Sequence, residues 1–375
     1  MKMNFSTQNL RDVFAEDGKF DNFKQLCFDL NHGNKLYDFD EDGNRYEITK
    51  KEANKAIQHV FMEICGLTDA DLASPKKVKR AVKAHHNEIF EIIEDDVEFK
   101  VVTGLTEDEW FTEFVEYRNE SLGDQTEFEI TADNVLFIVA EVSGDHHDLT
   151  MQSLPRNSFA RVNVKRYGMK VGKDIDLVVL GRVDYTQLTD KIAESFIYDI
   201  REKCFTAMYG AASKLPNNSQ FNKTGVLSTT TKGAFDTLLE DVATANNSDI
   251  YIVGTKMALK KLNALADVDW ASNDQKKEMN TLGRLGSYEG TTLVEIPQKF
   301  RLNDVKEKLY SNNVLFVFSR NEDKFIKMLD KGETEIVEAG ENKGDLADDF
   351  QTYEAQRSYG VGVTLGQYFG VWTVE

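Results

Sequence analysis

The chain has 375 residues, 41% of them hydrophobic and 29% charged, a composition that suits a folded protein with two or three compact regions. No apolar run approaches the roughly 18 residues of a membrane-spanning helix, so a membrane protein is not expected. The net charge of −19 disfavours sequence-independent nucleic-acid binding by the chain as a whole, because that binding depends on clustered lysine and arginine. The lack of a signal-peptide pattern and the three widely spaced cysteines, Cys27, Cys65 and Cys204, predict a cytosolic protein without disulfides.

The first part of the chain, residues 1–120, is predicted to be mostly helical. Short helical pieces extend to residue 33, and a hairpin with its turn at residues 40–43 follows. The acidic residues around this turn imitate the start of a calcium-binding loop, but Thr49 stands where such a loop needs a bidentate glutamate. A plain hairpin turn is therefore favoured over a calcium site.

Capping signals mark the starts of three further helices in this part. The signals and their predicted helices are Thr49 with Glu52 for 53–65, Ser74 with Pro75 for 75–97, and Thr106 with Glu109 for 107–118. The first half of the 75–97 helix is basic and its second half is acidic, the reverse of the order that the helix dipole favours. Its charges are therefore expected to serve contacts.

Between residues 121 and 180 the pattern changes to strands, with period-two alternation at 159–167. A strip without any acidic residue carries a local charge of +6 on Arg156, Arg161, Lys165, Arg166, Lys170 and Lys173. Such a strip suits either a phosphorylated ligand or the acidic surface of another copy of the chain. The second role is favoured, because the alternation indicates a hairpin with no accompanying pocket.

The second half of the chain begins with the clearest predicted helix, at 186–209, where apolar residues recur at every fourth position. A domain boundary is predicted in the breaker-rich connection after it. A compact α/β module then follows a helix at 232–243. The parts of the module are a strand at 249–253, a helix at 255–262, a glycine-rich loop at 283–290 and a strand at 291–296.

No catalytic, cofactor or metal site is predicted. None of the six histidines lies in the module or after it, and the adjacent pairs, His85 with His86 and His146 with His147, point to different faces and do not readily share a metal. The glycines of residues 360–366 imitate a dinucleotide-binding loop, but no helix follows them. Strand glycines at a closely packed edge are the favoured interpretation.

The order of these parts resembles the major capsid protein of tailed phages, with the coat-protein fold of the Hong Kong 97 type. The resemblance covers roughly residues 75–375, and its most specific motifs lie at 252–256, 285–290 and 294–297. It implies an α+β fold in these parts: 1–120, a helical N-terminal arm; 121–180, a strand-rich segment with an extended loop at about 143–173; 181–224, the long spine helix and connection of the peripheral domain; 225–320, the axial α/β domain; 321–375, a strand-rich return to the peripheral domain.

The resemblance also implies where subunits meet. The six basic residues of the strip would lie in an extended loop laid over a neighbouring subunit. A second contact would be formed by the axial-domain loop, with the residues Arg284, Ser287, Tyr288 and Glu289.

The function implied by the resemblance is that of a non-enzymatic major capsid protein. Such a protein assembles in the host cytoplasm, as hexamers and pentamers, into an icosahedral virion shell around double-stranded DNA that it does not bind specifically. Scaffolding, portal and decoration proteins are the further partners that the family suggests, and no cofactor or membrane is involved. Two alternatives remain open: an encapsulin-like compartment shell, and a cytosolic α/β enzyme that acts through carboxylates.

Overall fold

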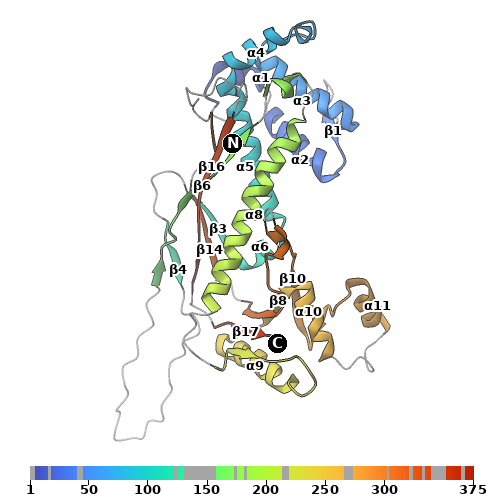
Figure 1. The fold of residues 1–375 in the computed structure, drawn as a ribbon, viewed down its shortest axis with the longest axis vertical. Helices are drawn as coiled ribbons and strands as arrows, with labels where there is room; N and C mark the ends of the chain where they lie inside the picture. Colours follow the sequence, from blue (N-terminus) through green and yellow to red (C-terminus); the bar gives the residue numbers. More distant parts are fainter. Residues whose placement is uncertain are drawn as a thin grey trace, which may run out of the picture. The chain divides into compact units, whose positions relative to one another are not determined.

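The computed structural model shows a mixed helix and sheet protein, so the predicted α+β class is confirmed (Figure 1). It describes residues 5–15, 18–39, 45–120, 126–130, 158–172, 175–180, 184–212, 219–265, 273–301, 304–320, 324–331, 334–338, 352–364 and 368–375. The chain forms two compact units. Unit 1 consists of Met1–Glu107, Val164–Ile200 and Asp330–Tyr359, and unit 2 of Asp108–Asn163, Arg201–Leu329 and Gly360–Glu375.

Unit 1 begins with the predicted short helices. Its helical elements are α1 (Gln8–Val13), α2 (Lys19–His32), α3 (Lys50–Ile64), η1 (Asp71–Ala73), α4 (Pro75–Ala84), α5 (His86–Thr106) and α7 (Ile175–Val179). The predicted hairpin is confirmed in its strands, because β1 (Tyr37–Phe39) pairs antiparallel with β2 (Arg45–Glu47), while its turn lies outside the described residues. The first capping box is also confirmed: the Thr49 hydroxyl accepts from the backbone N–H of Glu52, whose carboxylate accepts from the backbone N–H of Thr49.

The prediction of one helix over 75–97 is wrong, because the helix is broken at His85. This residue has φ −113° and ψ 21°, so α4 ends before it and α5 begins after it. On α4 only Val78 and Val82 are buried, whereas α5 is buried along most of its length. Helix α4 buries only one side, whereas α5 is a core helix. The break at His85 lets the two helices pack in different surroundings.

The prediction of a capped helix over 107–118 is also wrong. Thr106 belongs to α5 and donates its hydroxyl to carbonyl groups of the preceding turn, so it does not cap a new helix. The helix that follows is α6 (Glu109–Phe114), with Asp108 at its N-cap. The chain then becomes extended at once, in β3 (Val115–Glu120).

A long helix and a small sheet complete unit 1. The predicted helix over 186–209 is confirmed as α8 (Tyr185–Ala212), whose first half belongs to this unit and runs beside α5 (Figure 1). Strand β6 (Lys165–Gly172) pairs antiparallel with β16 (Thr352–Val363) at eight positions. The opposite edge of β16 pairs with β15 (Glu335–Glu338). Both β6 and β15 are thus held by the C-terminal part of the chain.

The strand predicted over 159–167 is divided in two. Its first part is β5 (Ser158–Ala160), which pairs antiparallel with β4 (Phe128–Ile130) in unit 2, and its last part begins β6. Between them the chain passes close to Gly360, where an added Cβ would lie 2.5 Å from the carbonyl oxygen of Asn163. The close packing predicted for this glycine is confirmed.

Unit 2 is built on a six-stranded sheet. In spatial order its strands are β7 (Asn222–Thr224), β17 (Gly370–Thr373), β13 (Val314–Ser319), β8 (Ile250–Thr255), β10 (Thr291–Ile296) and β9 (Ser287–Tyr288). Its helical elements are α6, the second half of α8, α9 (Lys232–Asn246), α10 (Lys256–Lys260), η2 (Lys261–Ala264) and α11 (Asn273–Leu282). Also present are β11 (Phe300–Arg301) paired with β12 (Asp304–Lys308), and β14 (Ile326–Lys331), a neighbour of β3.

The predicted α/β module is the centre of this sheet. Strands β8 and β10 are parallel, and a parallel pair needs a crossover, which α10 begins directly after β8. One face of the sheet packs against α9 through a core that includes Phe235, Leu238, Ile252, Leu315 and Trp372. No helix in the described part of the chain has the length and apolar character needed to cross a membrane.

Candidate functional site

Two arginines of the basic strip are already paired within their own subunit. Nε and Nη2 of Arg161 lie 2.7 Å and 2.5 Å from Oε1 of Glu127 in unit 2. In unit 1, the guanidinium of Arg166 forms an ion pair with Glu335 of β15. All four side chains are exposed, so these pairs are formed in solvent and reduce the positive charge of the strip.

Two lysines of the strip lie among the described residues, and their positive charges are not neutralised by a described carboxylate. Lys165 and Lys170 lie on β6, their side chains are exposed, and neither forms an ion pair with a described residue. Lys165, Arg166 and Lys170 thus share one strand of unit 1, whereas Arg161 belongs to unit 2. Arg156 and Lys173 lie outside the described residues.

The predicted axial-domain loop is anchored at its base by buried, hydrogen-bonded side chains. The guanidinium of Arg284 is buried, with Nε 2.9 Å from a carboxylate oxygen of Glu295 and Nη1 2.9 Å from the carbonyl oxygen of Leu285. The buried hydroxyl of Tyr288 donates to Asp236 at 2.8 Å. Burial and this hydrogen bond raise the pKa of Tyr288 above its usual range, so the tyrosine stays neutral.

The tip of the same loop faces solvent. Ser287 and Glu289 are exposed, and Glu289 has φ +44° next to Gly290 at +86°, so the turn is tight. The Glu289 carboxylate lies 2.6 Å from Nζ of Lys232 at the start of α9. Of the four predicted loop residues, Arg284 and Tyr288 therefore hold the loop in place, and Ser287 and Glu289 face solvent, with Glu289 paired to Lys232.

A buried charged cluster in unit 1 was not predicted from the sequence. Nζ of Lys100 on α5 lies 3.2 Å from Asp96 and 2.6 Å from Asp190 of α8, and it donates to Thr189 at 2.7 Å. Burial alone would lower the pKa of Lys100, but the two carboxylates raise it above its ordinary value. The cluster joins the two helices, and its signal in the sequence was an Asp96–Lys100 pair four residues apart at the end of the acidic half of the predicted helix.

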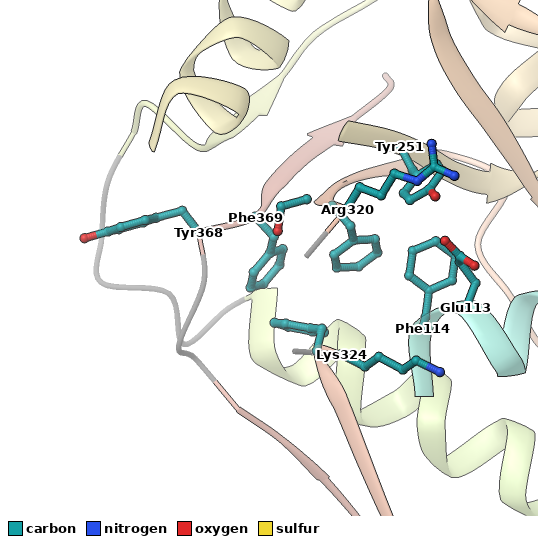
Figure 2. Close-up of a pocket in the computed structure, with 10 residues that line it drawn as sticks. Glu113, Phe114, Tyr251, Arg320, Lys324, Tyr368 and Phe369 are labelled. Carbon is teal, nitrogen blue, oxygen red and sulfur yellow. The ribbon is translucent and has the colours of Figure 1, made fainter. Parts of the chain in front are cut away.

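A small aromatic cavity lies in unit 2 between α6, β8 and the chain that follows β13. Its volume is about 40 Å³, and it is lined by Glu113, Phe114, Tyr251, Phe318, Ser319, Arg320, Lys324, Phe325, Tyr368 and Phe369. Figure 2 shows the guanidinium of Arg320 beside the Tyr251 ring, whose centre is 5.1 Å away, while the ring of Tyr368 points away from the others. Burial and a hydrogen bond to Glu113 raise the pKa of Tyr251 to about 12.

The chemistry available in this cavity is limited. Its volume suits about three water molecules, and Glu113 is the single carboxylate among its lining residues. An enzyme that acts through paired carboxylates would need a second acid here. The cavity is therefore a small gap among aromatic rings of unit 2, with one carboxylate in its lining.

The cysteines and histidines of the described residues form neither a reactive thiol nor a metal-binding cluster. All three cysteines are unpaired and buried, and burial raises the pKa of Cys65 and of Cys204 to about 12, which keeps both thiols protonated. Within the described ranges no group of three histidine, cysteine or acidic side chains is placed to hold a metal ion. His85 instead bonds to Glu88 through Nδ1 at 2.6 Å.

Comparisons with known proteins agree with the predicted resemblance. No match was found among curated proteins. Among solved structures, the chain is similar to the capsid of cyanophage P-SCSP1u, with 15% identity and a TM-score of 0.47 over 71% of this chain and 88% of that chain. The mature capsid of bacteriophage PhiM1 has 10% identity and a TM-score of 0.47 over 71% and 87%. The SrpI encapsulin complex of Synechococcus elongatus has 10% identity and a TM-score of 0.40 over 71% and 87%.

The family match extends over nearly the whole chain. Residues 22–373 match the model of a single family, described as the SPbeta prophage-derived putative capsid protein YonB. The match includes the basic strip, α8 and the whole six-stranded sheet of unit 2. The resemblance to phage capsid proteins is thereby confirmed, and the chain belongs to the YonB capsid protein family.

Proposed function

We propose that this capsid protein is the major, non-enzymatic subunit of a tailed-phage shell, and that it self-assembles in the host cytoplasm into an icosahedral particle around double-stranded DNA. The observation that carries the proposal is the family match over residues 22–373. Hexamers and pentamers of the chain would form the particle, and scaffolding, portal or decoration proteins would join it.

Three parts of the subunit have structural roles in the proposed shell. Residues 143–173 form the extended loop over a neighbour, α8 is the spine helix, and residues 225–320 form the axial domain around the symmetry axes. Support for the last role comes from the loop tip at Ser287 and Glu289, which is exposed on a buried and hydrogen-bonded base. A contact loop of a lattice needs that combination of rigidity and exposure.

Charge complementarity supports the role of the strip. Lys165 and Lys170 present unpaired positive charge on a chain whose net charge is −19, so the surface of a second copy attracts them. One exposed ion pair contributes only about 0 to 1 kcal/mol. In a closed shell each subunit repeats such contacts with several neighbours, and the contributions add through effective concentration.

Charge reversal tests the assignment of the strip. We expect the K165E/K170E variant to remain a folded subunit and to lose assembly, as measured by sedimentation velocity. The control variant K51E/K55E makes the same change of charge at two exposed lysines of α3 and should still assemble. Shells of normal yield from K165E/K170E would remove the strip from the subunit contacts.

A further inference from the structure

Helix α4 carries a basic surface that the assembly proposal does not use. Its ten residues contain five basic side chains and no acidic one. All five are exposed: Lys76, Lys77, Lys79, Arg80 and Lys83. A charge of +5 on ten residues is a local reversal in a chain whose net charge is −19.

The five charges lie on one side of the helix. At 100° per residue they fall within an arc of about 160°, and they extend over about 10 Å along the axis. The opposite side carries Val78 and Val82, which are buried where α4 packs on α7 and η1. The exposed side is therefore a continuous cationic face, interrupted only by the small side chain of Ala84.

Much of this charge is not neutralised within the subunit. Lys77 forms an ion pair of 2.6 Å with Asp71, just before the helix. Lys76, Arg80 and Lys83 form no ion pair with any residue that the structure describes. Three positive charges at positions i, i+4 and i+7 are thus directed toward solvent along one face.

We propose that the exposed face of α4 binds the phosphate backbone of double-stranded DNA. The inference rests on the proposed function, which places such DNA inside the shell, and it requires that α4 faces the lumen. Contacts of lysine and arginine with phosphates need exposed positive charge and no pocket. The proposed contacts are made with phosphates and not with base edges, so binding is expected to be independent of sequence.

The composition of the face argues against a protein partner. Protein interfaces have an apolar, often aromatic core and are depleted in lysine. On α4 both valines are buried in the subunit and no aromatic residue occurs, so a second copy would find no apolar core to cover. The same lack of aromatic rings disfavours single-stranded nucleic acid, whose bases stack on them.

The test measures binding of the full chain to a short labelled DNA duplex by fluorescence anisotropy, between about 50 and 200 mM salt. The variant K76Q/R80Q/K83Q removes three phosphate contacts. The matched control K50Q/K51Q/K55Q removes three exposed charges from α3. We expect the α4 variant to bind about tenfold or more weakly at low salt, with a salt slope smaller by about 2.7, and the control to bind like the wild type.

The same proteins are examined for folding and for shells. All six substituted side chains are exposed, so thermal unfolding midpoints should be unchanged. Equal DNA affinity of the wild type and the α4 variant would overturn the inference, whether or not the variant still assembles. Shells that form normally from that variant leave the proposed function intact in either case. Failure of the wild type to form shells would overturn the proposed function, while the comparison of DNA affinities would still decide whether α4 binds DNA.

Discussion

At the scale of single residues, the buried Lys100 has the largest expected effect on stability. Its side chain is almost fully buried between the carboxylates of Asp96 and Asp190, and removing it leaves two acids without a cation. We expect Lys100→Met to lower the free energy of unfolding by roughly 3 to 5 kcal/mol, as measured by chemical denaturation of the subunit. Lys191→Met on α8 is the control, because Lys191 is exposed and its pair with Glu194 contributes about 1 kcal/mol or less.

Asp71 gives a pH-dependent prediction at the same scale. Hydrogen bonds from Lys77 and from Thr68 lower its pKa from 3.8 to about 2. Because the pKa in the folded state lies below the unfolded value, Asp71 stabilises the fold above about pH 4, and this contribution disappears as the pH falls toward 2. NMR titration of its carboxyl group should give a midpoint near 2, which Lys77→Gln should raise; a wild-type midpoint near 3.8 would show that these contacts do not form in solution.

At the scale of secondary-structure elements, Gly360 of β16 tests the close packing of that strand. A Cβ at this position would lie 2.5 Å from the backbone oxygen of Asn163, which cannot rotate away as a side chain would. We expect Gly360→Ala to destabilise unit 2 by about 1 to 3 kcal/mol in thermal or chemical unfolding. Gly210 of α8 has open space around it, so Gly210→Ala should leave stability unchanged or raise it by up to about 1 kcal/mol. Equal effects of the two changes would contradict the packing.

Elements whose signal is local were predictable from the sequence. The apolar periodicity of residues 186–209 predicted α8, and the capping box of Thr49 and Glu52 predicted the start of α3. Strands β8 and β10 followed from short β-branched runs bounded by glycine and proline. In each case the residues that decide the structure lie within a few positions of one another.

Features that depend on distant partners were not predictable. The break at His85 involves no glycine or proline, and it follows from the different surroundings of α4 and α5. The partners of Arg161 and Arg166 lie 34 and 169 residues away, so a sequence-based charge of +6 overstated the charge that the strip offers. Likewise Lys100 finds Asp190 only when α5 and α8 pack together.

At the scale of the whole molecule, the chain is an acidic capsid protein with two local basic surfaces, the strip and the exposed face of α4. We propose that Lys165 and Lys170 of the strip contact a neighbouring subunit and that the exposed face of α4 binds DNA, on a chain whose net charge is −19. Attraction between exposed charges is screened by salt, so both contacts are expected to weaken as ionic strength rises.

Electron microscopy of the purified full-length protein, produced without any other phage protein, tests the central claim most directly. The account predicts closed shells of uniform size, because the contacts that we propose are made between copies of this chain. Fields that contain only particles of subunit size or small open oligomers, from protein shown to be folded, would contradict it.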